Sequence, residues 1–212
     1  MRVSPILLIA AALSFAQLSG TKVDLPKITP FDKGFSIMKS LSLRKSAASG
    51  DFLKANELSL LELSELLWAA NGINRINEGK RTAPSAMNAQ DIEVYVLSKN
   101  GAYLYDAQKH SLNLVSSVDL RNLAAGSQTE FGYAPIILLL VSDISKFPGK
   151  DNASKQKYGA IDAGIVSQNV SLYCSGSGLI TRVRAFMEAD ALKKALKLNA
   201  SQVPMLNHPI GK

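Results

Sequence analysis

Apolar residues recur at helical spacing between residues 59 and 72. The positions that share one face, three and four residues apart, are Leu60, Leu63, Leu66 and Leu67, with Leu61 and Trp68 widening it. Ser59 and Glu62 have the spacing of a capping box, and Gly72 stands where a left-handed residue would end the helix. The pattern predicts a core helix that is covered on more than one side.

The hydrophobic period changes to two in the middle of the chain. Residues 92–97 and 103–105 alternate and flank Asn100-Gly101, a dipeptide typical of a type I′ turn, so they predict a hairpin. Residues 112–115 are a candidate third strand. Residues 135–141 are apolar on both faces, which predicts a central strand with helices covering both sides of the sheet.

Helices and strands mix in the rest of the chain. Residues 35–43 and 188–198 predict short helices, and Asp162 is a good N-cap for a helix that runs to the glycine break at residues 176–178. Residues 179–186 alternate like a strand. Residues 203–212 predict an extended tail that lies along the sheet or on a partner. The fold class is therefore α+β.

Residues 72–90 form a polar stretch, for which we expect a long loop. Loops of this length are uncommon in compact domains unless they serve a function.

The N-terminus predicts export. Arg2 precedes an apolar run over residues 6–15, and small residues follow, which is the arrangement of a secretory signal peptide in residues 1–20. We expect cleavage after Ala16 or Gly20, then an exposed lead over residues 21–37. The apolar run is shorter than a membrane span, so a stable anchor is disfavoured, and a buried first helix is the other alternative. An exported chain of this kind is expected in the periplasm.

Charge and cysteine content exclude several classes. Removing Arg2 from 24 basic residues leaves 23 against 17 acidic ones, a net charge of +6, but the basic residues form no stripe that would predict nucleic-acid binding. Cys174 is the only cysteine, so no intramolecular disulfide forms and no cysteine near the signal carries a lipid. We expect Cys174 to be buried.

The common catalytic patterns are also absent. His110 and His208 have no cluster of cysteine or carboxylate residues around them, so we expect surface or cap histidines and no metal site. Gly176 and Gly178 lack the third glycine and the following helix of a dinucleotide fingerprint. No Gly-x-Ser-x-Gly elbow surrounds Ser177, so a hydrolase is improbable.

The polar residues that remain suit a phosphate and the edge of a polar ring. They are Arg44, Lys45 and Ser46 behind the first helix, and Arg81, Pro84, Ser85 and Asn88 in the long loop. Taken alone, Arg44 and Lys45 are equally well explained as a solvated helix end, where cations complement the helix dipole. Ser85 and Asn88 are equally well explained as turn formers.

A family resemblance emerges from the order of these pieces. Arg-Lys-Ser at residues 44–46 precedes the segment Leu-Leu-Trp-Ala-Ala-Asn-Gly, then Arg-Thr-Ala-Pro-Ser-Ala-Met-Asn-Ala-Gln at residues 81–90, Asp-Ala-Gly at 162–164, Gly-Leu at 178–179 and Pro-Ile-Gly at 209–211. In this order the pieces resemble the nitroreductase family of FMN-dependent oxidoreductases. The similarity is closest to the branch that includes the azoline dehydrogenases of peptide maturation. It covers residues 38–212 as one FMN-binding domain.

The resemblance implies where FMN binds. Arg44 and Ser46, with Lys45 between them, would hold the phosphate. The loop residues that would border the isoalloxazine ring are Pro84, Ser85, Ala86 and Asn88. Gly178, Leu179 and Ile180 would pass the other side of the ring, with backbone amides facing the redox nitrogen. Lys212 would add a charge near the phosphate.

Two departures weaken this assignment. Family members commonly carry a basic residue two positions after the motif serine, where this chain has Ala48. The negative charge of the reduced ring would then be stabilised less, or by Lys80 or Arg81. Relatives also often continue beyond Pro-Ile-Gly with a basic residue, whereas Lys212 is the last residue here.

The resemblance implies a nitroreductase-like sandwich with a mostly antiparallel central sheet, intertwined as a homodimer with FMN at the interface. Its activity would be electron or hydride transfer through FMN to or from a small organic substrate, with NAD(P)H or another electron donor. No side chain need act as acid or base. The alternative is an exported flavin-binding or structural protein of the same fold without turnover, which Ala48 favours.

Overall fold

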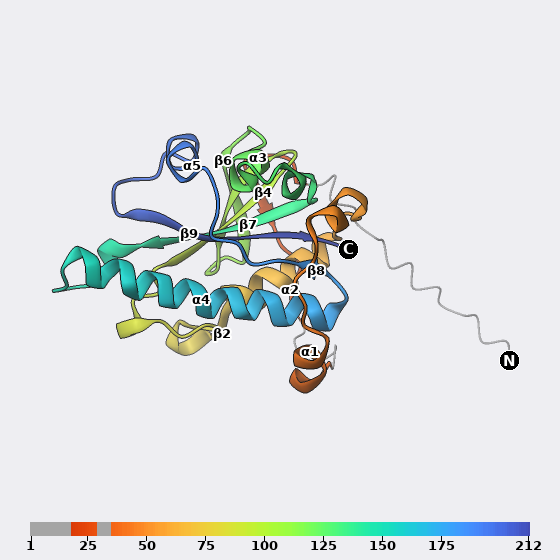
Figure 1. Ribbon diagram of the computed structural model, residues 1–212. Coiled ribbons are helices and arrows are strands. Elements are labelled where there is room, and N and C mark those ends of the chain that lie inside the picture. Colours follow the sequence, from red (N-terminus) through yellow and green to blue (C-terminus); the bar gives the residue numbers. More distant parts are fainter. Residues whose placement is uncertain (1–17, 29–34) are drawn as a thin grey trace, which may run out of the picture.

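Two layers of helices enclose one antiparallel sheet (Figure 1). The computed structural model describes residues 18–28 and 35–212. The strands of its seven-stranded sheet are, in spatial order, β1 (Lys22–Asp24), β6 (Ser111–Ser116), β5 (Gly101–Asp106), β4 (Ile92–Ser98), β7 (Ile136–Asp143), β9 (Gln202–Gly211) and β8 (Ile180–Thr181). The α+β class and the antiparallel sheet are confirmed.

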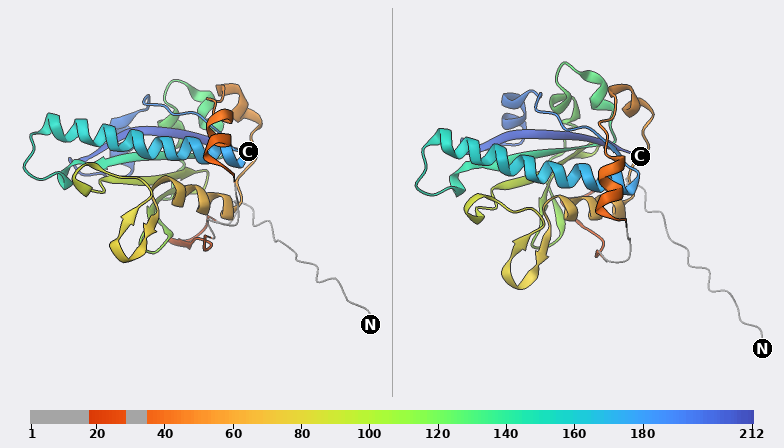
Figure 2. Two further views of the ribbon diagram at one scale, coloured as in Figure 1. Left: turned by 90° about the horizontal axis from the view of Figure 1, so that it is seen from below. Right: turned by 60° about the horizontal axis from the view of Figure 1, so that its bottom comes forward.

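Each face of the sheet has its own hydrophobic core. One face is covered by α1 (Ile37–Leu43), α2 (Leu60–Asn71) and α4 (Asn152–Ser177). The other is covered by η2 (Ser49–Lys54), α3 (Arg121–Ala125), η5 (Thr129–Tyr133) and α5 (Ala189–Ala195). Figure 2 shows α4 running the length of the sheet, with α1 packed at its C-terminal end.

The predicted central strand is confirmed as β7. It lies between β4 and β9, and residues 136–141 are 0% exposed because alternate side chains enter the two cores. The predicted tail is β9, an interior strand between β7 and β8.

The helix predicted from residue 59 is confirmed with its cap. Ser59 Oγ accepts from the Glu62 amide at 3.2 Å, and Glu62 Oε2 accepts from the Ser59 amide at 2.8 Å. The prediction that Gly72 is left-handed is wrong, because its backbone is extended, with φ −75°. Glycine fits here because a Cβ would come within 2.5 Å of the Trp68 ring.

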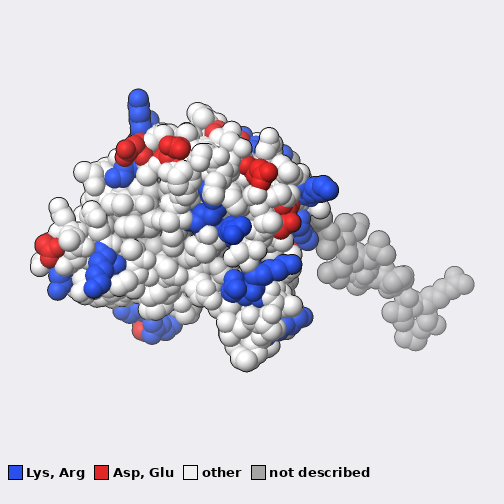
Figure 3. All heavy atoms as spheres, viewed as in Figure 1, with Lys and Arg blue, Asp and Glu red and all other residues white. Residues whose placement is uncertain are grey.

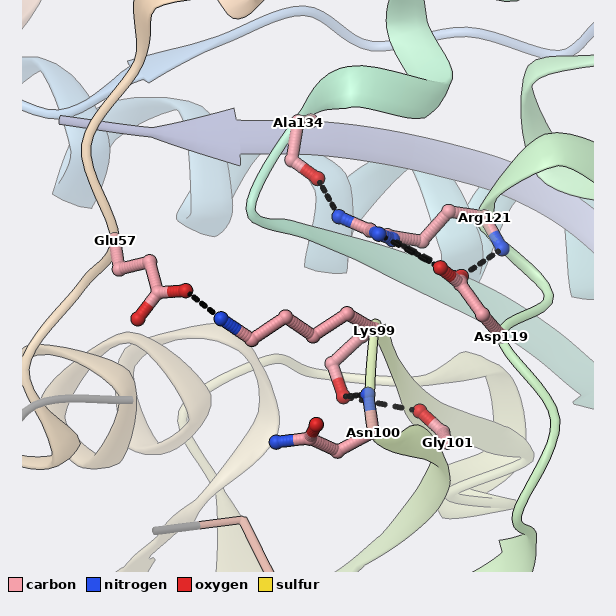
Figure 4. Close-up of polar contacts among 8 residues, drawn as sticks. Glu57, Lys99, Asn100, Gly101, Asp119, Arg121 and Ala134 are labelled. Atoms are coloured by element: carbon pink, nitrogen blue, oxygen red, sulfur yellow. Dashed lines mark hydrogen bonds and ion pairs between the residues drawn. The ribbon is translucent and has the colours of Figure 1, made fainter. Parts of the chain in front are cut away.

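The hairpin between β4 and β5 is confirmed, but its turn type is wrong. Ser98 pairs with Gly101, so Lys99 and Asn100 make the turn, and neither is left-handed. Ser98 Oγ accepts from the Asn100 amide and donates to the Gly101 carbonyl (Figure 4). Gly101 instead has φ +132° at the start of β5, where a Cβ would lie 2.4 Å from the Ser116 carbonyl.

Two ion pairs lie near this hairpin, and one of them joins it to a neighbouring segment (Figure 4). The Lys99 ammonium pairs with Glu57, just before α2. Arg121 pairs with Asp119 at 2.7 Å and donates to the Ala134 carbonyl at 2.8 Å, which joins α3 to the segment before β7.

Other predicted boundaries are corrected. α4 begins ten residues before Asp162, and its N-cap is Asp151. The sequence pattern did not reveal this start, because the first three turns of the helix are polar and show no apolar period. The strand over residues 179–186 shortens to β8 and a single bridge at Arg184, because the Arg184 side chain turns inward.

The polar stretch after α2 is only partly a loop. It folds into the hairpin β2 (Ile73–Arg75) and β3 (Lys80–Arg81) around η3 (Ile76–Glu78), followed by η4 (Ala86–Asn88). η6 (Ile144–Lys146) follows β7.

The lead over residues 21–37 is not exposed throughout. β1 pairs with β6, and Val23 and Leu25 are buried because alternate residues face the core. Leu18, which precedes the lead, is buried as well. The part of the lead at residues 29–34 and the signal residues 1–17 lie outside the described residues. No helix among the described residues is long and apolar enough to cross a membrane.

Candidate functional site

The predicted phosphate segment follows the end of α1. Arg44 caps this helix, and its amide donates to the Ser40 carbonyl at 2.9 Å. The Ala47 amide then donates to the Thr181 carbonyl at 3.0 Å, which places residues 44–46 beside the edge strand β8. Arg44, Lys45 and Ser46 are exposed, so two cations and a hydroxyl face outward at the C-terminal end of α4.

These cations are available to an anion. Within residues 18–28 and 35–212, no carboxylate lies at ion-pair distance from Arg44 or Lys45. A guanidinium that forks onto two oxygens beside a hydroxyl donor has the chemistry that a phosphate monoester needs. The same placement also fits a solvated helix end, so binding measurements must separate the two.

The turn after α4 lies next to this segment. Gly178 is left-handed at φ +80° and ends the helix. The amides of Gly178 and Leu179 both donate to the Cys174 carbonyl, the latter at 2.9 Å. They are therefore used by the helix cap, and a bond from an amide to a ligand falls to Ile180 or beyond.

Lys212 lies at the same end of the sheet. Its backbone exchanges two hydrogen bonds with Asn56, at 2.8 and 3.0 Å. Its ammonium pairs with Glu62 Oε1 at 2.7 Å. This ion pair and the Ser59 hydrogen bonds lower the pKa of Glu62 against the opposing effect of its burial, which is the largest single influence. In this structure the positive charge of Lys212 is therefore neutralised by its ion pair with Glu62.

The predicted ring loop has a strained backbone. Met87, Asn88 and Gln90 have φ of 54°, 54° and 47°, whereas the other non-glycine residues of positive φ in the described chain, His110 and Lys197, are isolated. Left-handed residues other than glycine cost roughly 1 kcal/mol each. Such strain persists only where the surroundings impose it, and it gathers at functional sites.

Hydrogen bonds impose this conformation. The Ala86 amide donates to both carboxylate oxygens of Asp162, at 3.1 and 2.9 Å. Ser85 Oγ accepts from the Gln90 amide at 2.8 Å, and the Gln90 side chain accepts from Arg81 Nε at 3.0 Å. The loop is thereby fixed to the middle of α4.

The loop leaves one polar group exposed. Among the described residues no hydrogen bond to the Asn88 side chain occurs, and Asn88 and Pro84 are exposed. An amide can donate and accept at the mixed edge of a polar ring. The hydroxyl of Ser85, by contrast, is used within the loop, and Arg81 also donates to the Asn71 carbonyl at 2.9 Å.

The structure brings six of the ten predicted residues together in one chain. Residues 44–46, 178–179 and 212 meet at one end of α4, whereas the ring loop contacts Asp162, 16 residues earlier in the helix. At 1.5 Å per residue this is ~24 Å. A fused three-ring system is far shorter, so residues of one chain cannot border one ring from both sides. Figure 1 shows the hairpin that leads into the loop and α1 at separate places along α4.

Comparison with known proteins supports a family assignment. A sequence model of the nitroreductase family matches residues 51–212. The chain belongs to the nitroreductase family. Family membership implies an oxidoreductase, and FMN is the cofactor typical of it.

Individual relatives cover almost the whole chain. A nitroreductase-family protein of Ralstonia eutropha is 32% identical, with a TM-score of 0.83 over 95% of this chain and 93% of that one. A nitroreductase-family protein of Methanocaldococcus jannaschii is 28% identical over 90% of this chain and 96% of its own length.

More distant structures share the fold alone. The microcin synthetase complex McbBCD of Escherichia coli contains a chain that is 21% identical, with a TM-score of 0.69 over 90% of this chain and 78% of that one. A protein of Staphylococcus epidermidis described as an NAD(P)H:FMN oxidoreductase is 14% identical, with a TM-score of 0.62 over 89% and 90%.

The residues of this nitroreductase-family chain fit FMN in two respects. The cations of residues 44 and 45 have no carboxylate partner among the described residues, and the Asn88 amide is exposed on a fixed loop.

The expectation of surface histidines is wrong for His208. It is 0% exposed between Ser167 Oγ at 2.8 Å and Thr181 Oγ1 at 3.2 Å, and burial lowers its pKa to about 3.

His110 is half-buried and also structural. It lies between Ser64 Oγ and Tyr105 OH, each at 2.8 Å, and burial lowers its pKa. Cys174 is buried as predicted, which raises its pKa. No cluster of metal-ligating residues occurs in the described chain.

Sequence reasoning missed the role of Asp162. It appeared as a helix cap, yet it is 2% exposed in the middle of α4 and faces Asp91, which is 0% exposed. Burial, and then the neighbouring Asp162, raise the pKa of Asp91 to about 7, although Ser142 donates a hydrogen bond to it. Asp91 is therefore protonated below that pH.

Replacing Asp91 tests this buried proton. The folded chain keeps the proton up to about pH 7, whereas the unfolded chain releases it near pH 4. The free energy of unfolding should therefore fall as pH rises from 4 to 7, by on the order of 4 kcal/mol. Asp91→Asn keeps a donor toward Asp162 and removes the titration. Urea unfolding at pH 4.5 and pH 8 should show the variant gaining stability over wild type at the higher pH only.

A matched control is Asp119→Asn, which changes an exposed carboxylate outside this pair. Equal pH slopes in wild type and Asp91→Asn would contradict the raised pKa of Asp91.

Proposed function

We propose that this chain is an FMN-dependent oxidoreductase that passes electrons or hydride through bound flavin to or from a small organic molecule. The observation that carries the proposal is the pairing of an open phosphate segment at residues 44–46 with a fixed, strained loop at residues 84–88 in a chain of the nitroreductase family. Both features are expected of a site organised for a ligand that has a phosphate and a polar ring.

The side chains have separate roles in this proposal. Arg44 and Ser46 bind the phosphate, and Lys45 adds positive charge. Pro84, Ser85, Ala86 and Asn88 border the ring, with the Asn88 amide as the polar contact. FMN, when bound, supplies the redox chemistry, and the protein supplies orientation and exclusion of water. Lys212 joins the phosphate site only if it leaves Glu62.

A homodimer completes this site. The ~24 Å along α4 between its C-terminal end and Asp162 supports an arrangement in which loops of two chains border one ring. α1 also exposes an apolar row beside the phosphate segment: Ile37, Met38, Leu41 and Leu43 are 48–70% exposed. Figure 3 shows α1 projecting from the body with a largely uncharged tip. Ile161 on α4 and Met87 in the ring loop are exposed as well, so a second copy would cover both ends.

Dimerisation is tested by charging α1. Light scattering of the holoprotein should give about twice the chain mass, and Met38→Glu should shift it toward the monomer because a charge is buried in the interface. FMN should be lost in the same variant. Val118→Glu, at a residue 59% exposed before α3, should remain dimeric. A wild-type monomer that retains FMN would contradict the architecture.

The phosphate assignment is tested by titrating apoprotein with FMN. A charge-assisted hydrogen bond contributes ~1.5 to 3 kcal/mol, so Arg44→Ala should weaken FMN binding roughly ten- to a hundredfold. Asn88→Ala should weaken it less and change the flavin spectrum or reduction potential more, because it contacts the ring.

Arg75→Ala is the matched control, since Arg75 pairs with Glu78 on the β2–β3 hairpin and should not affect binding. If Arg44→Ala binds FMN as wild type does, Arg44 is a solvated helix end.

The alternative function is a flavin-binding protein without turnover. Ala48 favours it, because this position offers no charge to the reduced ring, and Arg81 is held by Gln90 and Asn71 at the far end of the site. Anaerobic reduction of the bound flavin by NAD(P)H or dithionite, followed by an acceptor, separates the two functions. Reoxidation by a small organic acceptor indicates an enzyme. The azoline-dehydrogenase branch predicts azoline peptides among the compounds to test.

Export to the periplasm is proposed from the order of Arg2, the apolar run and Ala16. Leu18 is 1% exposed, and its carbonyl accepts from Tyr103 OH at 3.1 Å. Cleavage after Gly20 would remove this contact, so we expect cleavage after Ala16. Mass spectrometry of the protein from its native source should find the N-terminus at Gln17. An intact Met1 in a cytoplasmic fraction would contradict export.

A further inference from the structure

A polar pocket lies on the opposite side of the Ala47 segment from α4. It encloses about 470 Å³, and its walls include Ser49, Ser127, Thr129, Phe131, Arg182 and Arg184. This volume suits a small molecule. Arg182 Nη1 donates to the Ala47 carbonyl at 3.1 Å, so the pocket begins one residue beyond the phosphate segment.

Arg184 brings a buried positive charge to this pocket. It is 6% exposed, and each of its five N–H donors meets a neutral acceptor on Ala124, Ala125, Gln128 or Asn207. No carboxylate lies at ion-pair distance from it in the described chain. These bonds fix the side chain and leave its charge uncompensated. A buried charge without a partner is costly in a folded protein.

A second guanidinium lies next to the first. The Arg184 and Arg182 guanidinium carbons are 4.4 and 6.0 Å from the centre of the same Phe131 ring. Burial, with the nearby Arg182, lowers the pKa of Arg184. Arg182 is half-exposed and makes one hydrogen bond, to Ala47, so most of its five donors remain for a ligand. Two like charges at this spacing are relieved by a bound anion.

One carboxylate opposes them. Glu130 is exposed at the rim and accepts a hydrogen bond from Ser49 Oγ. The side chains that line the pocket therefore sum to one net positive charge, two arginines against one glutamate. The hydroxyls of Ser127 and Thr129 add neutral donors and acceptors.

We propose that this pocket binds the oxyanion of a small polar molecule, with Arg182 as the group that contacts it and Arg184 as the fixed charge behind it. A carboxylate is the favoured ligand, because a guanidinium forks onto two coplanar oxygens and the surrounding hydroxyls suit a hydroxylated acid. The pocket begins beside the phosphate segment, and we expect it to bind its anion both with and without flavin.

Malate is the probe for this pocket. Calorimetric titration of the full chain in low-salt, phosphate-free buffer should show malate binding with and without saturating FMN. Arg182→Gln should weaken it roughly tenfold or more, and Arg182→Lys should weaken it less, because the charge stays while the fork is lost. Glu130→Gln should tighten it a few-fold by removing the opposing charge. Arg75→Gln should leave it unchanged.

Several outcomes would overturn the proposal. They are no malate binding, equal binding by wild type and Arg182→Gln, and loss of binding on FMN saturation, which would assign Arg182 to the flavin site. Inorganic phosphate titrated into FMN-saturated protein distinguishes the sources, since binding tighter than malate would replace the carboxylate by a phosphate ester. Melting curves show whether each variant is folded. If Arg182→Gln does not fold, malate binding by Arg182→Lys and Glu130→Gln tests the proposal instead. Malate binding by a protein that takes no FMN would contradict the proposed function alone.

Discussion

The contact between the Asp162 carboxylate and the Ala86 amide is the interaction on which the candidate site depends. It joins the strained loop to the one element that spans the whole sheet, the 26-residue helix α4. Without it, the left-handed backbone at Met87, Asn88 and Gln90 would lose this link to the helix and depend on the hydrogen bonds that Ser85 and Gln90 make. A carboxylate in this buried position is expensive by itself. The hydrogen bonds from the Ala86 amide and the neutral form of Asp91 beside it reduce that expense, so the stability of the pair and the shape of the loop are coupled.

The length of α4 has a second consequence. It holds the ring loop and the phosphate segment at a fixed separation, so neither can move toward the other without bending a helix whose inner face is buried from Gly159 to Cys174. A ligand that contacts both therefore has to span this separation or bind between two copies of the chain. The homodimer proposed above takes the second arrangement, in which two rigid surfaces leave a single separation between them.

The sequence predicted elements where one period or one cap decided the outcome. The Ser59–Glu62 box and the doubly buried β7 are of this kind, since each follows from residues that are neighbours in the chain. It failed where tertiary contacts decided. Asp162 has the side chain of a cap, but its partners, Asp91 and the Ala86 amide, are more than 70 residues away. Gly72 and Gly101 were correctly noticed as special and wrongly explained, because the limit is a close neighbour, Trp68 or the Ser116 carbonyl, and not a turn.

The candidate site divides in the same way. The Arg-Lys-Ser segment and the Pro-Ser-Ala-x-Asn loop are local motifs, so the residues could be named from the chain. Which charges remain uncompensated could not be, because this depends on the register that sets Ala47 beside Thr181 and carries Arg182 to the same edge. The same register brings Lys212 to Glu62 and leaves Arg182 and Arg184 without a carboxylate at ion-pair distance among residues 18–28 and 35–212. At this edge of the sheet, positive charge thus comes from Arg182 and Arg184, which follow β8. Ala48, on the same side, supplies no charge.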